Sequence, residues 1–181
     1  MADKNWRAGT RAIHAGQTIG PAGERAVPIA QTTSFVFKDT GHAARLFALD
    51  EFGQIYSRIG NPTLDILEAR IAAIDGGVGA LAFSSGMAAI AAGVLNITAA
   101  GQNIVAASAL YGGTVTLFAH TFRRMGITVK FVDVTKPEEF RRAIDANTRL
   151  VYVESVCNPK NDVHDFEKIA KIAHAAGIPV L

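Results

Sequence analysis

The sequence has very little cysteine and no marked excess of charge of either sign. Cys157 is the single cysteine among 181 residues, so the chain cannot form an internal disulfide or a zinc site built from several cysteines. Lys and Arg number 18 against 16 Asp and Glu, a formal net charge of +2, and the basic residues are spread along the chain. This pattern gives no electrostatic signature of nucleic acid or an acidic membrane as a partner.

Several common ligand-binding motifs are also missing. No Gly-Lys-Ser or Gly-Lys-Thr occurs, which excludes a P-loop. The glycine cluster at 76–79 precedes an apolar run instead of following one, so it lacks the context of a dinucleotide-binding fingerprint. The histidines show neither i, i+4 pairing nor a carboxylate at a useful spacing, and we expect no metal site. They are His14, His42, His120, His164 and His174.

Apolar segments that direct a protein to a membrane or to export are scarce. Residues 1–6 contain no apolar signal-peptide core, and together with the single cysteine this predicts a cytoplasmic protein. Val78 to Ala100 carries no charge and is long enough to span a bilayer. However, it consists mostly of Ala, Gly and Ser, and Ser84-Ser85-Gly86 interrupts it near its start. We expect this segment to form a buried strand followed by a buried helix.

Beyond an irregular N-terminal stretch, short apolar runs alternate with longer amphipathic ones. Glycine and proline punctuate residues 1–60, which predicts an arm. Asn61 as N-cap and Pro62 then open a helix that ends at Gly76-Gly77. The alternation beyond it predicts an α/β fold with a mainly parallel sheet. The expected strands are 80–83, 104–107, 128–132, 150–154 and 178–181, with helices starting near Gly86, Thr114, Pro137 and Asp165.

Four motifs could carry chemistry, three at expected strand ends and one on the arm. Ser84-Ser85-Gly86-Met87 opens a helix, whose first N–H groups suit a phosphate. Tyr56-Ser57-Arg58 offers a phenol and a guanidinium, both common phosphate partners. Tyr111-Gly112-Gly113-Thr114 offers a ring face or a proton beside two glycines that permit close backbone approach. Glu154 to Pro159 presents a carboxylate and an amide over the same edge. Ordinary packing or turn formation also explains each motif taken alone.

Together and in this order, the four motifs resemble the signatures of the cystathionine synthase and methionine lyase family of fold-type I enzymes, which depend on pyridoxal 5'-phosphate (PLP). The similarity runs from about Thr10 to the last residue. Residues 31–37, 47–49 and 103–131 look most like the O-acetylhomoserine sulfhydrylases of this family. The resemblance implies the aspartate aminotransferase-like fold, with PLP as cofactor. Residues 1–60 would be an arm that contacts a neighbouring subunit, and 61–181 the first, incomplete part of the PLP-binding large domain.

By this resemblance, the phosphate of PLP would lie at the start of the helix that follows Ser85. The N–H groups of Gly86 and Met87 would bind it, with Ser85 nearby. Tyr56 and Arg58 would reach the same phosphate from a neighbouring subunit. The resemblance therefore implies a homodimer or homotetramer with shared active sites.

The resemblance also implies roles at the strand ends. Tyr111 would be catalytic, because it would stack on the pyridine ring and move a proton through its hydroxyl. Asn158 would bind the ring oxygen of the cofactor, and Glu154 would support the edge beneath it. Cys157 departs from the small residue that is usual before Asn-Pro in this family, and we expect it to be a buried hydrophobe.

The reaction implied is replacement at the γ-carbon of O-acetyl-L-homoserine by sulfide or methanethiol, which gives homocysteine or methionine plus acetate. Methionine γ-lyase or cystathionine γ-synthase activity stays open, as does a non-catalytic binding module. A nicotinamide-binding domain is disfavoured, since its glycine fingerprint is missing. Lys136 and Lys160 do not match the family's cofactor-binding lysine, which we expect beyond Leu181 together with its pyridine-binding aspartate. The 181-residue chain alone is therefore expected to be inactive.

Overall fold

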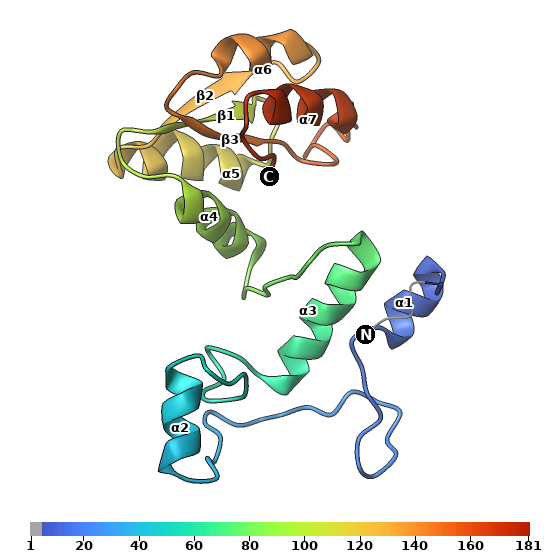
Figure 1. The fold of residues 1–181 in the computed structure, drawn as a ribbon. Helices are drawn as coiled ribbons and strands as arrows, with labels where there is room; N and C mark the ends of the chain where they lie inside the picture. The colour runs from blue at the N-terminus through green and yellow to red at the C-terminus, as the bar shows by residue number, and fades with distance from the viewer. Residues whose placement is uncertain (1–4) are drawn as a thin grey trace. The chain divides into compact units, whose positions relative to one another are not determined.

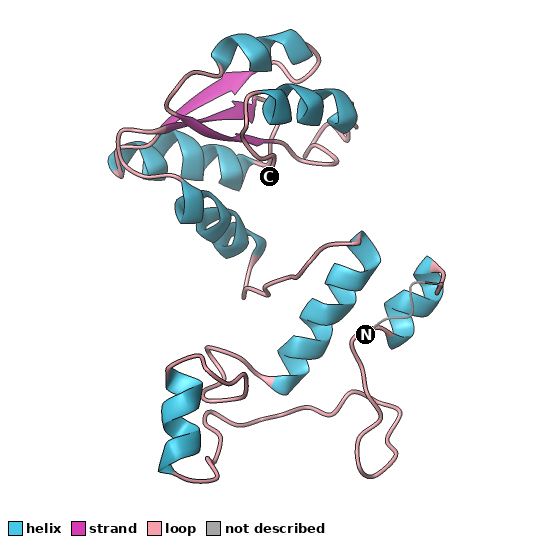
Figure 2. Cartoon of the chain, viewed as in Figure 1, coloured by secondary structure: helices cyan, strands magenta, loops and turns pink. Residues whose placement is uncertain are grey.

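The chain divides into two compact units after Ala82. The computed structural model describes residues 5–181. The first unit contains α1 (Ala8–His14), α2 (Thr40–Phe47) and α3 (Pro62–Asp75), joined by long loops (Figures 1 and 2). Neither α1 nor α2 was predicted from the sequence, which indicated only an irregular arm before residue 61.

The helices α2 and α3 begin at side chains that cap their first backbone N–H groups. The Asp39 carboxylate accepts a hydrogen bond from the first turn of α2. Asn61 accepts one from the N–H of Thr63 at 2.9 Å, and Pro62 occupies the first turn of α3. Gly76 ends α3 with φ 71°, a left-handed conformation that glycine adopts without strain. The predicted start and end of this helix are confirmed.

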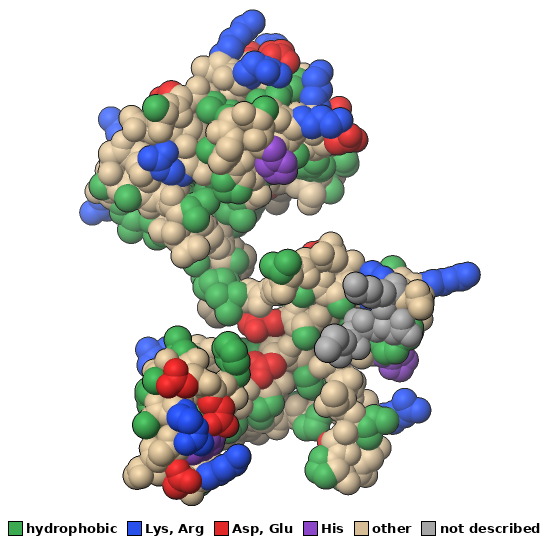
Figure 3. Space-filling view, in the orientation of Figure 1, with side chains coloured by type: hydrophobic (Ala, Val, Ile, Leu, Met, Phe, Trp, Pro, Cys, Tyr) green, Lys and Arg blue, Asp and Glu red, His purple; other side chains and the backbone are tan. Residues whose placement is uncertain are grey.

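The first unit holds few buried side chains. Among its described residues, the buried hydrophobic ones are Ala15 and Leu46. Charged side chains of both signs lie close together around α2 in Figure 3, where Arg45 pairs with Glu51 at 3.0 Å. This unit is therefore held by capping, turns and polar contacts more than by an apolar core.

The second unit is a parallel sheet between two layers of helices. Figure 1 shows α4 and α5 on one face of the sheet and α6 and α7 on the other. The strands run in the order β2-β1-β3, all parallel, so the predicted α/β class is confirmed. The elements are α4 (Gly86–Ile97), β1 (Asn103–Ala107), α5 (Gly112–Thr116), a π-helical continuation η1 (Leu117–Phe122), β2 (Thr128–Val132), α6 (Pro137–Ala143), β3 (Thr148–Tyr152) and α7 (Phe166–Ala175).

Two of the predicted strands are absent or reduced in the structure. Residues 80–83 form no strand, because the N–H of Ala82 donates to the Glu68 carboxylate at 2.8 Å instead of to a neighbouring strand. The predicted strand 178–181 is reduced to a bridge between Val180 and Val151, although Leu181 still exchanges backbone hydrogen bonds with β3. An apolar run becomes a strand only where a partner strand lies beside it.

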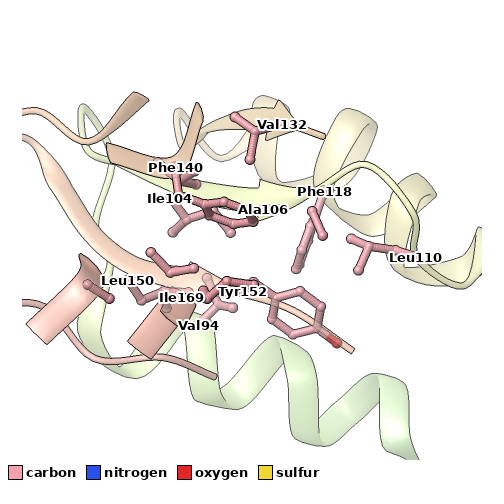
Figure 4. Close-up of a cluster of buried hydrophobic side chains, with 14 of the residues drawn as sticks. Val94, Ile104, Ala106, Leu110, Phe118, Val132, Phe140, Leu150, Tyr152 and Ile169 are labelled. Atoms are coloured by element: carbon pink, nitrogen blue, oxygen red, sulfur yellow. The ribbon is translucent and has the colours of Figure 1, made fainter. Parts of the chain in front are cut away.

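The apolar core lies on both faces of β1 and β3. Figure 4 shows side chains from the strands packed against those of the helices, with Phe118 and Tyr152 edge to face. Their ring centroids are 4.9 Å apart. Of α4, Val94 alone is fully buried, so the prediction of a buried helix was wrong for most of its length. No helix within residues 5–181 is long and apolar enough to cross a membrane.

A polar network joins the three strands where they begin. Thr148 and Asn103 are buried, and the Thr148 hydroxyl donates to the Asn103 side-chain oxygen at 2.8 Å. Asn103 in turn donates to Asp145 at 2.9 Å, and the Lys130 ammonium pairs with the same carboxylate at 2.5 Å. These bonds hold the pKa of Asp145 well below its usual value, with the Lys130 contact as the largest cause. The network fixes the strand starts, at the edge opposite the candidate site.

Candidate functional site

The loops that follow β1 and β3 meet at one edge of the sheet, because both strands are parallel. Glu154 lies just after β3, and both of its carboxylate oxygens accept from the backbone N–H of Tyr111, at 3.0 and 3.1 Å. The Thr114 hydroxyl donates to the same carboxylate at 3.3 Å. A carboxylate from one loop thus binds the start of the helix that follows the other strand, where the partial positive charge of a helix favours an anion.

Tyr111 presents its ring at this edge. It is the N-cap residue of α5, and the residue is 48% exposed. Its backbone is fixed by Glu154, whereas the ring is available to a ligand. The sequence singled out both residues as site candidates, but it did not indicate that the carboxylate binds the tyrosine N–H.

Cys157 supplies a second contact between the same two loops. The residue is 1% exposed, which confirms the predicted burial. The Sγ atom donates to the Ala109 carbonyl at 3.0 Å and lies 2.8 Å from Nε2 of His164. Burial, followed by the charges of Glu154 and Asp162, raises the pKa of the Cys157 thiol above its usual value.

Asn158 follows Cys157 directly and has an exposed side chain. It lines a cavity of about 230 Å³, together with residues 108–110 after β1 and Lys160. The predicted amide at this edge is therefore beside the loop that leads to Tyr111. His164, which the sequence suggested was an ordinary histidine, contributes through Cys157. Six residues of irregular loop separate the two, and no periodicity could reveal the pair.

The start of α4 carries the third group of candidate residues. Ser85 caps the helix by accepting from the N–H of Ala88 at 3.2 Å. The N–H groups of Gly86 and Met87 donate to no other group in the described part of the chain, as is usual for the first turn of a helix. Apart from its bonded neighbours and the backbone of its own helix, a Cβ atom built on Gly86 would meet no heavy atom within 4 Å. The first turn of α4 therefore has two free donors, and the Cβ side of Gly86 is open.

Tyr56 and Arg58 belong to the first unit, on a segment that is better ordered than an irregular arm. Tyr56 forms an antiparallel bridge with Ser34, and the Arg58 guanidinium lies 5.3 Å from the centroid of the Tyr56 ring. Asn61 donates to the Ala30 carbonyl at 3.0 Å, which ties the same segment to the preceding loop.

The two lysines considered in the sequence have different surroundings. The Lys136 ammonium pairs with Asp133 at 3.2 Å and Glu139 at 3.6 Å, and Asp133 is the main cause that raises its pKa. A raised pKa disfavours the neutral amine that a nucleophilic lysine requires. Lys160 lies beside Asn158 at the small cavity. Within residues 5–181, no group of three or more His, Cys, Asp or Glu side chains is arranged to hold a metal ion.

Comparison with known proteins adds relatives that are similar along nearly the whole chain. O-acetyl-L-homoserine sulfhydrylase from Leptospira meyeri is 52% identical over 179 residues, which cover 98% of this chain and 40% of the relative. Homocysteine/cysteine synthase from Kluyveromyces lactis is 52% identical over 174 residues, covering 95% and 39%. The chain thus spans about 40% of the length of these relatives.

Solved structures agree with these relatives. The crystal structure of a Campylobacter jejuni protein named as an O-acetylhomoserine (thiol)-lyase matches 97% of this chain with a TM-score of 0.94 and 36% identity. The match covers 43% of that protein, which carries N'-pyridoxyl-lysine-5'-monophosphate. The family model described as Cys/Met metabolism PLP-dependent enzyme matches residues 9–181. This chain therefore belongs to the Cys/Met metabolism PLP-dependent enzyme family.

Proposed function

We propose that the whole protein containing this chain uses PLP to replace the acetate of O-acetyl-L-homoserine with sulfide or methanethiol. The products are homocysteine or methionine, plus acetate. The observation that carries the proposal is the 52% identity to an O-acetyl-L-homoserine sulfhydrylase over 179 residues. The strand-edge arrangement of Tyr111 and Glu154 supports it, because ligands in open α/β folds bind at the carboxyl ends of strands.

The start of α4 fits the phosphate of PLP. Gly86 and Met87 offer two N–H donors without partners, and the space beside Gly86 is open. The positive end of the helix dipole favours an anion at that position. The Ser85 hydroxyl accepts from the helix, so its proton is free to be donated to a phosphate oxygen. In this proposal these three residues bind the phosphate from within the chain.

The residues at the strand ends bind the ring of the cofactor and handle a proton. PLP, when bound, supplies an electron sink for carbanions next to the substrate's amino group. The exposed ring of Tyr111 stacks on the pyridine ring, and its hydroxyl exchanges a proton with the leaving group. Asn158 donates its side-chain amide to the ring oxygen. Glu154 acts through the backbone of Tyr111 and supports this edge.

Residues 1–60 act as an arm toward a neighbouring subunit, and residues 61–181 begin the PLP-binding domain. In this assembly Tyr56 and Arg58 complete the phosphate site in trans, and the protein is a homodimer or homotetramer. The guanidinium fork of Arg58 suits a phosphate. A single cysteine is consistent with function in the reducing cytoplasm.

The activity is tested with purified whole protein, PLP, O-acetyl-L-homoserine and sulfide, following homocysteine and acetate together. Equal formation of the two products is expected. A parallel reaction with methionine as the substrate and no added thiol tests the alternative lyase activity. Faster release of methanethiol from methionine than of acetate from the ester would replace this proposal with a methionine γ-lyase.

The shared site is tested by mixing two impaired variants of the whole protein. One carries Arg58→Ala, which should weaken cofactor binding by roughly 1.5 to 3 kcal/mol through loss of a charge-assisted hydrogen-bonded pair. The other lacks the cofactor-binding lysine. Mixed dimers should regain activity, because one of their sites combines an intact lysine with the partner's arginine. No recovery in samples shown by native mass spectrometry to contain mixed dimers would place Arg58 in its own subunit's site or outside any site.

A further inference from the structure

The ring of Tyr111 lies directly against Gly113. A Cβ atom built on Gly113 would be 2.5 Å from Cε1 of the ring, 3.1 Å from Cδ1 and 3.3 Å from Cζ. The first of these separations is shorter than any that real Cβ atoms adopt. The Tyr111 side chain therefore folds back over its own helix and occupies the space that any other residue at 113 would need.

Gly112 lies between Tyr111 and Gly113. Apart from these two bonded neighbours and the backbone of its own helix, a Cβ atom built on Gly112 would meet no heavy atom within 4 Å. Both glycines belong to α5, and neither has the positive φ that would strain a larger residue. Backbone conformation thus requires glycine at neither position, and at Gly113 an added methyl group would meet the Tyr111 ring.

We propose that Gly113 is a positioning residue, which sets the direction of the Tyr111 ring by leaving the volume that the ring occupies. The backbone N–H of Tyr111 is already held by Glu154 at 3.0 and 3.1 Å. Only the side-chain torsions of Tyr111 remain to be fixed, and they place the ring against the Cα atom of Gly113, which carries no side chain. The expectation that a displaced ring would bind PLP less well rests on the proposed function. The position of the ring against Gly113 does not depend on that function.

The contact predicts which atoms move when Gly113 is enlarged. To reach the 3.4 Å limit of ordinary van der Waals contact, Cε1 must retreat by about 0.9 Å. Tyr111 as a residue is 48% exposed, so rotation about its side-chain bonds is easier than a shift of α5. Gly113→Ala should therefore fold and present Tyr111 in another direction.

The test is a pair of crystal structures of the whole protein, Gly113→Ala and Gly112→Ala. Both substitutions raise helix propensity by the same amount, so helix stability does not distinguish them. The Tyr111 ring should be displaced in Gly113→Ala and should superpose on the parent in Gly112→Ala. An unmoved ring in Gly113→Ala, or equal displacement in both variants, overturns the proposal.

A double-mutant cycle in thermal unfolding covers the case in which Gly113→Ala is too unstable to crystallise. If the ring is the obstacle, Tyr111→Ala should remove the loss of melting temperature caused by the alanine at 113 and leave only the gain from higher helix propensity. An equal loss with and without the ring would assign the effect to the backbone and refute a positioning role.

PLP affinity gives a separate readout. The dissociation constant should rise about 2- to 12-fold in Gly113→Ala, the range expected for a lost ring–ring contact. A moved ring with unchanged PLP affinity would uphold the positioning role of Gly113 and contradict the stacking role given to Tyr111 under the proposed function.

Discussion

Replacing Glu154 with alanine should loosen the start of α5 without unfolding the sheet. The carboxylate accepts from the Tyr111 N–H at 3.0 and 3.1 Å and from the Thr114 hydroxyl at 3.3 Å. Thr114 is fully buried, so its hydroxyl loses its acceptor in a place that water does not reach. Tyr111 is exposed, and water can replace the carboxylate at its N–H.

A hydrogen bond to a charged group contributes about 1.5 to 3 kcal/mol. Because Glu154 is half-buried and one of its partners is reachable by water, the lower end of that range, about 1.5 kcal/mol, is expected. This free energy corresponds to a roughly tenfold change in a local opening equilibrium. Glu154→Gln keeps an acceptor oxygen and nearly the same shape, so its effect should be about half as large in free energy.

Amide hydrogen exchange measures this opening residue by residue. The Tyr111 amide should exchange roughly tenfold faster in Glu154→Ala, by the same free energy, while the buried β1 residue Val105 serves as an internal reference and keeps its rate. Unchanged exchange at Tyr111 would refute the view that Glu154 holds this N–H. Faster exchange at Val105 as well would instead show that the whole sheet had been weakened.

Three further predictions concern titratable groups. Burial and the charge of Glu154 raise the pKa of Tyr152 to about 12, so Glu154→Gln should lower that pKa in an absorbance titration at 295 nm, and no change would contradict the coupling. The Lys130 contact holds the pKa of Asp145 below its usual 3.8, so the stability lost in Asp145→Asn should be fully present above about pH 4 and should vanish as the pH falls through the depressed pKa; a urea-unfolding difference that is constant with pH would argue against this. Cys157, buried and with a raised pKa, should resist a thiol reagent at pH 8 until denaturant is added, and rapid stoichiometric labelling of the native chain is the contrary result.

The sheet could be predicted where hydropathy and pairing agree. The predicted strand 128–132 coincides with β2, because an alternating run is bounded on both sides by turns. β3 begins at Thr148, two residues before the predicted start. Thr148 can be buried because its hydroxyl donates a hydrogen bond to Asn103. A strand prediction based on apolar residues leaves out a polar residue that is buried in this way.

The helices before residue 61 could not be predicted from the sequence in the same way. Asp39, a common N-cap residue, directly precedes α2, yet the glycine and proline elsewhere in residues 1–60 indicate an irregular segment. Side-chain contacts were also beyond the sequence. The Tyr111 ring lies 2.5 Å from the place where a Cβ atom of residue 113 would be, and the residue types at 111–113 alone do not indicate this contact.

Asn61 gives the candidate phosphate ligand Arg58 a stable frame. One side-chain amide caps α3 through Thr63 and donates to both the Ala30 carbonyl and the Ser57 hydroxyl, at 3.0 and 2.9 Å. The order of this segment is therefore established when the chain folds, and a ligand meets an arginine whose backbone has already lost most of its conformational freedom. Asn61 itself need not contact the cofactor for this effect. Its substitution would restore conformational freedom to the segment and would thereby weaken the binding of a ligand by Arg58.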